Sequence, residues 1–151
     1  MKRQQEGFTL IELVMVIVIL GILAAFALPR FADLGSNARV AAVQGIGSNI
    51  KSAAAIVHSQ ALVDNKASAA SSSVTLEGQV IDIAYGYPTA GTAIKTASQF
   101  SPTSSDYTET AAATTTTWDR VGGTAGSCTV VYTEATSTTS PASVSTNVSS
   151  C

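Results

Sequence analysis

The stretch Phe8–Leu28 reads FTLIELVMVIVILGILAAFAL, and Glu12 is its one charged residue. As an α-helix this stretch would be about 30 Å long, which matches the hydrocarbon core of a bilayer. A carboxylate inside a membrane-spanning helix costs about 2.5–3.5 kcal/mol on insertion scales. The sequence therefore predicts a membrane-spanning helix in which Glu12 needs a partner of opposite charge.

The residues that precede this stretch, Met1–Gly7, suggest that partner. They read MKRQQEG and carry two basic side chains. A secretory signal places its small-residue cleavage site after the apolar run, whereas here the small residue, Gly7, comes before it. Cleavage after Gly7 would keep the helix and create a new amine on Phe8. That amine would lie on the same helix face as Glu12, since residues at i and i+4 are neighbours on a helix.

This arrangement resembles the type IV pilins, whose motif is a leader that ends in Gly, then Phe-Thr-Leu-Ile-Glu, then an apolar helix. Here the motif runs from Gly7 to Glu12, and the resemblance covers about the first 61 residues. It implies cleavage after Gly7 by the prepilin peptidase, N-methylation of Phe8, and a role in assembly for Glu12 and Thr9. The short leader is the type found in class a pilins.

Two residues that weaken helices, Gly21 and Pro29, also fall where such pilins carry them. Small residues let helices approach closely in a membrane, which is the role expected of Gly21; a merely tolerated small residue is the alternative. Pro29 removes one backbone hydrogen bond, but the apolar pattern continues on both sides of it. We therefore expect Pro29 to kink one helix that runs from Phe8 to about Ala61 and is roughly 80 Å long.

After the proline, apolar residues recur every three or four positions. They are Phe31, Leu34, Ala38, Ala42, Ile46, Ile50, Ala53, Val57 and Ala61. This spacing is typical of an amphipathic helix that packs one face on a core. Gly45 and Gly47 lie within the same segment, and we expect both to allow close packing against the head.

The rest of the chain changes to a β pattern. Val74–Ile83 alternates around Glu77-Gly78 and predicts a short hairpin. Cys128–Thr133 is the best strand candidate in the second half of the chain, whereas Thr92–Phe100 is either a short helix or an irregular loop. The residues alone therefore predict a long helix followed by strands, an α+β chain.

The resemblance supplies the domain organisation and the packing. It implies a cleaved leader at residues 1–7, a transmembrane and filament-core half of the helix at 8–28, an amphipathic half at 29–61, and a globular β head with a C-terminal disulfide loop at 62–151. In the type IV pilin fold, the second half of the long helix packs on a small antiparallel sheet.

The two cysteines, Cys128 and Cys151, both lie beyond the predicted membrane span. Basic residues before the span place that end in the cytoplasm, so both cysteines would be exported to an oxidising compartment, which favours a disulfide. The bond would contribute about 3 kcal/mol in the chain-entropy model; two unrelated thiols are the alternative. In class a pilins a C-terminal disulfide encloses a variable loop exposed on the filament, and the resemblance implies that role here.

A shorter resemblance concerns Tyr85-Gly86-Tyr87-Pro88, which is expected to end the predicted hairpin with a turn. It is similar to the Gly-Tyr-Pro element of the mannose-sensitive haemagglutinin pilins. The resemblance implies that this chain is most like that group.

Charge and composition exclude several kinds of function. The formal charge is −2 and 12% of the residues are charged, so the sequence lacks the clustered basic residues of a nucleic-acid surface, and no nucleic-acid partner is expected. His58 is the one histidine, and we expect it to contact solvent or the head rather than a ligand. No group of His, Cys, Asp and Glu has metal-ligand spacing. The sequence predicts no enzyme, no metal and no cofactor.

The first candidate function is a structural subunit, a major pilin, of a type IV pilus. Such a subunit enters the inner membrane as a prepilin and is then assembled into an extracellular surface filament for adhesion. Its partners would be further copies of itself, the prepilin peptidase, the pilus assembly machinery, the inner membrane before assembly, and a host or surface glycan as receptor.

Two alternatives remain. A pseudopilin of a type II secretion system shares the leader and Glu12 but usually lacks a C-terminal disulfide loop. An exported enzyme or binding protein on a plain signal anchor would have no reason to keep Glu12 four residues from a cleavable Gly-Phe bond.

The leader predicts that the mature chain begins at methylated Phe8. Mass spectrometry of the protein recovered from the cell surface should find a first residue that is N-methylphenylalanine and no peptide from residues 1–7. A mature chain that still carries Met1–Gly7, or one that is cut after Ala25, would contradict this prediction.

Overall fold

The computed structural model describes residues 8–102 and 105–151; within the first range, only the backbone of residues 28–33 is described. Its elements begin with the long helix α1, Leu10–Val63, as the apolar pattern predicted. The chain divides into two compact units, Met1–Asn37 and Ala38–Cys151, which are described separately below. The second unit contains two antiparallel sheets and a short helix, so the α+β class is confirmed.

The first sheet has three strands in the order β1-β2-β3. Strand β1, Ser72–Leu76, pairs antiparallel with β2, Gln79–Ala84, and β2 pairs with the two-residue strand β3, Tyr87–Pro88. The predicted hairpin at Glu77-Gly78 is therefore present, while β3 extends the sheet beyond what the sequence indicated.

Both connections in this sheet are two-residue turns with positive φ at each central residue. Glu77 and Gly78 have φ of 50° and 78°, and Tyr85 and Gly86 have φ of 49° and 84°. Two consecutive positive φ angles define the type I′ turn, whose twist matches that of the strands it joins. The predicted turn at Tyr85-Gly86 is therefore confirmed, and it folds the chain back instead of ending the sheet.

The second sheet has four strands in the order β4-β5-β6-β7, each antiparallel to its neighbours. The strands are β4 at Tyr107–Ala111, β5 at Thr115–Arg120, β6 at Thr129–Thr133 and β7 at Ser143–Asn147. Strand β6 confirms the prediction for Cys128–Thr133. The resemblance implied one small sheet, whereas the described residues of the head form two.

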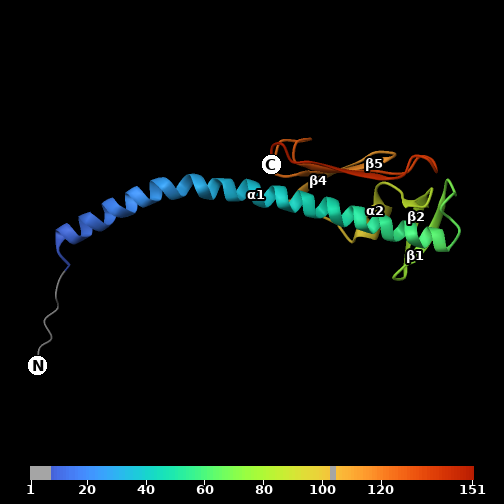
Figure 1. Cartoon of the computed structure of the whole chain (residues 1–151), viewed down its shortest axis with the longest axis horizontal. Helices are drawn as coiled ribbons and strands as arrows, with labels where there is room; N and C mark the ends of the chain where they lie inside the picture. The colour runs from blue at the N-terminus through green and yellow to red at the C-terminus, as the bar shows by residue number, and fades with distance from the viewer. Residues whose placement is uncertain (1–7, 103–104) are drawn as a thin grey trace, which may run out of the picture. The chain divides into compact units, whose positions relative to one another are not determined.

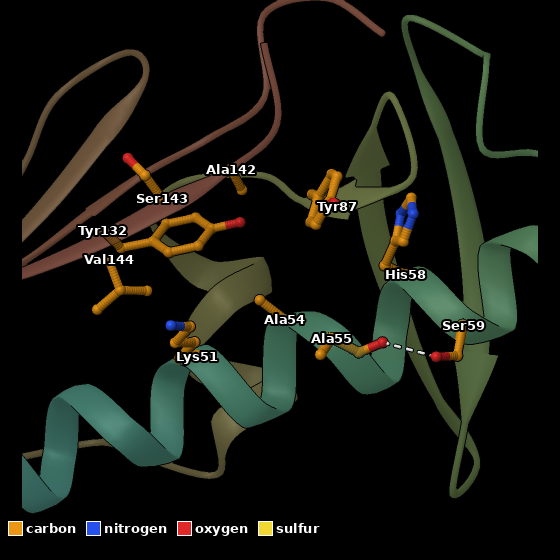
Figure 2. Close-up of a pocket in the computed structure, with 10 residues that line it drawn as sticks. All are labelled: Lys51, Ala54, Ala55, His58, Ser59, Tyr87, Tyr132, Ala142, Ser143 and Val144. Carbon is orange, nitrogen blue, oxygen red and sulfur yellow. Dashed lines mark hydrogen bonds between the residues drawn. The ribbon is translucent and has the colours of Figure 1, made fainter. Parts of the chain in front are cut away.

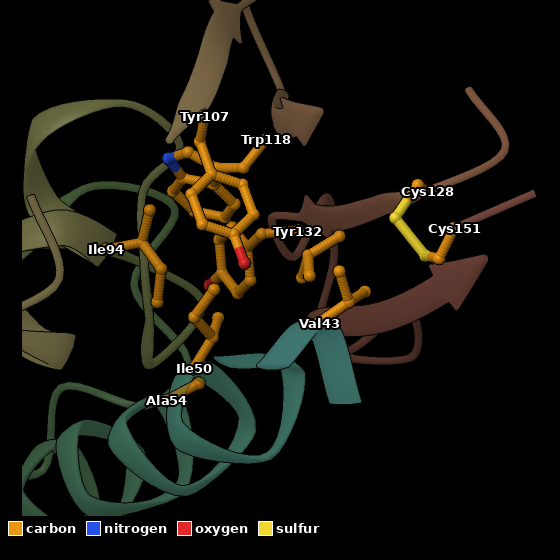
Figure 3. Packing of buried hydrophobic residues seen from close by; sticks show 10 residues of the cluster. Val43, Ile50, Ala54, Ile94, Tyr107, Trp118, Cys128, Tyr132 and Cys151 are labelled. Carbon is orange, nitrogen blue, oxygen red and sulfur yellow. A yellow bond between two sulfur atoms is a disulfide. The ribbon is translucent and has the colours of Figure 1, made fainter. Parts of the chain in front are cut away.

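Residues 38–63 of α1 provide one side of the core for both sheets (Figure 1). Val43, Ile50 and Ala54 pack with the second sheet, where Trp118 and Tyr132 are fully buried (Figure 3). Further along the same helix, Val57 and Ala61 pack with the first sheet. The members of this second cluster are Val57, Ala61, Val74, Ile81, Ile83 and Ala93. A single helical face thus organises both halves of the head.

Helix α2, Thr92–Ser98, joins the two halves from the other side. Ala93 belongs to the cluster under the first sheet and Ile94 to the cluster under the second. The segment Thr92–Phe100, for which the sequence left two alternatives, is therefore helical over most of its length. Its exact position matters because adjacent residues face different cores.

Three hydrogen bonds also connect the β3–α2 segment to the second sheet. The Tyr132 hydroxyl donates to the Pro88 carbonyl at 2.6 Å, and burial raises the pKa of that phenol above its ordinary value, which keeps it a donor. The Ala90 N–H donates to the Glu134 carboxylate at 2.6 Å. The Gly91 N–H donates to the Thr116 hydroxyl, also at 2.6 Å.

The amphipathic stripe was predicted correctly only towards the end of the helix. Ile50, Ala53, Val57 and Ala61 are buried as expected, and Ile46 is half-buried. Ala38 and Ala42 are exposed, because the buried face at that level runs through Val43 and Gly47 instead. In this part of the helix the predicted stripe is therefore displaced from the buried face. A helix has 3.6 residues per turn, so predicted positions spaced by four residues rotate steadily away from one face.

The two glycines of this segment differ in their surroundings. A Cβ atom added at Gly47 would collide with the Thr146 side chain of β7, so the predicted close packing is present there. A Cβ added at Gly45 would meet no atom within 4 Å, and the prediction for that residue is wrong. Gly45 is exposed.

We predict that alanine has opposite effects at these two positions. Gly45→Ala should raise the free energy of unfolding by about 0.5–1 kcal/mol, because alanine restricts the unfolded chain and favours helix. Gly47→Ala should lower it by about 1–3 kcal/mol, because the new methyl group must displace Thr146. Thermal unfolding of the full chain in detergent micelles, followed by Trp118 fluorescence, measures both. Changes of the same sign would contradict the packing described here.

Candidate functional site: the amino-terminal helix and the disulfide loop

The described amino-terminal part of α1 presents apolar side chains on every side. The stretch Leu10–Ala27 has a mean hydropathy of 2.9, and none of it is buried within the chain. Its large side chains are widely exposed, at 80% for Leu10 and 75% for Phe26. A helix that is apolar all round requires a lipid or protein environment. By length and composition this segment can cross a membrane.

A second segment, Leu34–Val63, also satisfies these length and composition criteria, with a mean hydropathy of 1.2. About a third of it, 33%, is buried inside the structure, and its buried face is the one that carries the core of the head. We therefore interpret it as a core helix and not as a second span.

Glu12, the one charged residue of the apolar stretch, is held by Thr9. The Glu12 carboxylate accepts a hydrogen bond from the Thr9 backbone N–H at 2.9 Å and another from the Thr9 hydroxyl at 2.5 Å. In return the Thr9 hydroxyl oxygen accepts from the Glu12 N–H at 3.4 Å. The Thr9 carbonyl accepts the first helical bond, from Leu13 at 3.3 Å. This reciprocal arrangement is a capping box, in which residue N3 and the N-cap satisfy one another's donors.

The capping box gives Glu12 a structural task that the sequence analysis missed. The signal was present, since Thr9-Leu10-Ile11-Glu12 fits the pattern Ser/Thr-x-x-Glu that begins many helices. A carboxylate at this position also opposes the partial positive charge of the helix amino terminus. The cap holds the Glu12 carboxylate on Thr9, the residue that follows Phe8.

The other predicted residues of this region are Gly7, Gly21 and Pro29, which the structure describes to different extents. Gly7 lies outside the described residues, so leader cleavage and methylation of Phe8 stay predictions. An added Cβ at Gly21 would meet no atom within 4 Å, so its face is open for an approaching helix. Pro29 lies within the bounds of α1, and its side chain is outside the described set.

The structure pairs Cys128 with Cys151, whose Cα atoms are 4.9 Å apart. Cys128 is fully buried and Cys151 is 8% exposed, and both belong to the core under the second sheet (Figure 3). The bond encloses all of β6 and all of β7 in one covalent loop. Arg39 on α1 donates from Nε to the main-chain oxygen of Cys151, so the end of the loop is tied to the helix as well as to β6.

Asn147 begins the motif Asn-Val-Ser, which fits a glycosylation sequon. Its side-chain amide donates to the Gly126 carbonyl at 2.7 Å, and its amide oxygen accepts from Ser149. These bonds fix the connection between β5 and β6 against the end of β7. In this conformation the amide is engaged in structure.

His58 contacts the head, one of the two environments that the sequence predicted for it. Its ring stacks on Tyr87 with centroids 4.1 Å apart and an interplanar angle of 8°. Its Nδ1 lies 3.2 Å from the Gly86 carbonyl oxygen. An added Cβ at Gly86 would lie 2.9 Å from the Ala67 Cα, so this turn requires glycine for space as well as for its positive φ.

Within residues 8–102 and 105–151 no group of three or more His, Cys, Asp or Glu side chains could hold a metal ion. The apolar helix, whose large side chains are exposed, is suited to contact with lipid or with other protein chains.

Residues 2–28 match the prokaryotic N-terminal methylation motif. Over 56 residues the chain is 54% identical to the type IV narrow pilus major component PilA5 of Thermus thermophilus; the match covers 37% of this chain and 48% of that protein. Over 51 residues it is 45% identical to the type IV major fimbrial protein FimA of Dichelobacter nodosus, covering 34% of this chain and 32% of the relative.

The chain thus matches less than half the length of these relatives, and no solved structure is similar to it. The family model matches residues 2–28, and both relatives are named as pilus or fimbrial components.

The disulfide should be a main contributor to the stability of the head. Replacing both cysteines, Cys128→Ser with Cys151→Ser, should lower the free energy of unfolding by about 3 kcal/mol, because the unfolded chain regains the freedom of the enclosed loop. Thermal unfolding of the full chain measures this, and reduction of the unaltered protein by dithiothreitol serves as a check should the variant not fold. Peptide mapping without reductant should recover the linked pair. Equal unfolding temperatures with and without reductant would contradict the prediction.

Proposed function

We propose that this chain is a major pilin, a class a structural subunit of a type IV pilus. In this proposal the prepilin resides in the inner membrane through Leu10–Ala27, is cleaved after Gly7 and methylated on Phe8. It then joins an extracellular filament built from further copies and serves attachment to surfaces. The prepilin peptidase and the pilus assembly machinery are its proposed partners during this sequence.

The observation that carries the proposal is the apolar segment of α1 with its one capped carboxylate. A plain membrane anchor gains nothing from a charge at this depth, which costs about 2.5–3.5 kcal/mol. A segment that moves from lipid into a bundle of identical helices can use that charge to recognise a neighbour. The methylation motif over residues 2–28 and the names of the relatives support the same conclusion.

The capping box suggests how recognition could work. Thr9 holds the Glu12 carboxylate at the start of the helix, beside the position of the future Phe8 amine. In an apolar bundle either charge alone is costly, and the pair of opposite charges is less so. An arriving subunit whose amine is unpaired would be drawn to an exposed Glu12 of the previous subunit. This contact would set how far one helix is shifted along the other.

The relatives give no support to the pseudopilin alternative, since those reported above are named as pilus or fimbrial components. The disulfide between Cys128 and Cys151 also favours a pilus subunit over a pseudopilin. A plain signal anchor leaves the Gly-Phe junction and the methylation motif without a purpose. Within the pilins, Tyr85–Pro88 supports a place in the mannose-sensitive haemagglutinin group, as part of this proposal.

Two substitutions at one position separate the charge of Glu12 from its capping role. Glu12→Gln keeps an oxygen that can accept from Thr9, so the helix cap persists while the charge is lost. Glu12→Ala removes both. If the charge directs assembly, both variants should be exported and cleaved normally, and filaments should be reduced at least tenfold while processed monomer accumulates in the inner membrane. Electron microscopy of sheared filaments and immunoblots of membrane fractions measure this.

The matched control is Thr9→Val, which removes the hydroxyl bond and keeps the carboxylate. It should lower helix stability by about 1 kcal/mol and leave filaments detectable. Normal filament yield from Glu12→Gln would show that the charge is dispensable. Loss of filaments in Thr9→Val and in Glu12→Ala, with normal yield in Glu12→Gln, would assign assembly to the cap instead.

A further inference from the structure

A groove lies on the head between the exposed side of α1 and the strands that face it (Figure 2). Its larger hollow has a volume of about 510 Å³, within the range of about 300–1,000 Å³ that is typical of small-molecule sites. A second hollow of about 220 Å³ continues along the helix beside β7. Lys51 and Val144 line both hollows, so the two are adjacent at that point.

Among the described residues of the second unit, Lys51 is the basic residue whose side chain has no hydrogen-bond or ion-pair partner. The other four basic side chains of residues 38–151 have partners: Arg39 with Cys151, Lys66 with Asp64 and Ser73, Lys95 with Glu109, and Arg120 with Asp106. No hydrogen bond or ion pair is formed by Lys51 among the residues that the structure describes. Neither hollow is lined by an aspartate or glutamate of the described chain.

An aromatic ring stands at the opposite end of the larger hollow. Tyr87 stacks on His58, with 4.1 Å between ring centroids, and His58 is itself fixed near the Gly86 carbonyl. In Figure 2 Tyr87 lies between His58 and the rest of the hollow, so one face of its ring is backed and the other faces the cavity. The C–H groups of a sugar ring pack on such a face, because an aromatic ring is apolar and negative at its centre.

The remaining lining combines small apolar and hydroxyl side chains. Ala54 and Ala55 form a shallow floor between Lys51 and the aromatic pair (Figure 2). Ser59 and Ser143 add hydroxyl groups at the rim, and in the second hollow Gln44, Ser48 and Thr146 add an amide and two more hydroxyls. Many neutral hydrogen-bonding groups, one aromatic face and one cation form a set that suits a polyhydroxylated ring with a carboxylate.

We propose that this groove binds an acidic saccharide of at least two units, with one sugar ring against Tyr87 and a carboxylate on Lys51. A nucleic acid is a poorer match, because its binding depends on neutralising several phosphates in a row, and the groove offers one cation. The inference does not depend on filament formation. It can be tested on the unassembled chain, so its failure and a failure of the proposed pilus function are distinguishable.

The probe is digalacturonic acid. Its matched neutral analogue is α-1,4-galactobiose, which carries hydroxymethyl groups in place of the carboxylates. Both are titrated into the isotope-labelled full chain in nonionic detergent micelles, and amide NMR signals of residues 47–59 and 142–146 report binding. We expect the acidic disaccharide to bind about tenfold more tightly, as one charge-assisted hydrogen bond allows. Lys51→Gln should abolish this preference while leaving weak binding of both sugars.

Two further variants complete the test. Ala55→Leu places a larger side chain on the groove floor, on an exposed helical position that tolerates leucine, and should remove binding of both sugars. Lys95→Gln is the control, because Lys95 pairs with Glu109 and lines neither hollow; it should change nothing. Equal affinity for the two disaccharides, a preference that survives in Lys51→Gln, or shifts confined to other residues would overturn the proposal. So would tighter binding of a thymidine hexanucleotide, or groove signals that change with protein concentration alone and reveal a second copy as occupant.

Discussion

The head depends on one constraint, which is that a single face of α1 must complete the cores of two sheets at once. Residues near Val43 and Ile50 pack under the second sheet, and Val57 and Ala61 pack under the first. Neither sheet could bury its apolar side without the helix, because the apolar face of a sheet must pack against another element. The spacing of α1 side chains therefore sets where each sheet lies along the helix, and α2 and the Tyr132–Pro88 hydrogen bond connect the two sheets to each other. The same helix carries the apolar amino-terminal segment, so one element serves both the head and the proposed filament core.

The parts of the fold that the sequence predicted are those with a regular, local signal. The long helix, the Glu77-Gly78 hairpin and the β6 strand each have a recognisable period or turn residue. The β4–β5 pair lacked such a signal, because the segment TAAATTTT at 110–117 offers almost no contrast between apolar and polar positions. There the fully buried Trp118, together with Thr116, decides which side faces the core, and this becomes visible only in three dimensions.

The candidate site shows a similar division. The sequence indicates Glu12 as the key residue because a charge in an apolar run is unusual, and it predicts the Phe8 amine as the partner of this carboxylate. The closer partner, Thr9, belongs to the same turn, and a capping box could have been predicted from the spacing alone. The groove around Lys51 could not have been found in this way, because its residues come from α1, β3, β6 and the β7 region, which are far apart in the sequence. A site whose residues come from separate segments of the chain produces no regular spacing in the sequence.

The disulfide has a mechanical consequence for the second sheet. An edge strand is normally the first to peel away when a sheet is pulled, because it is held by one neighbour only. Strand β7 is such an edge, yet the Cys128–Cys151 bond fastens the chain just beyond its last residues, and Arg39 fastens the same point to the helix. Force applied along α1 therefore reaches the end of the β7 segment through the Arg39 hydrogen bond, and the disulfide passes it on to Cys128 beside β6. Peeling of the sheets would therefore start at an edge that lacks a cross-link, such as β4 of the second sheet or the two-residue strand β3 of the first.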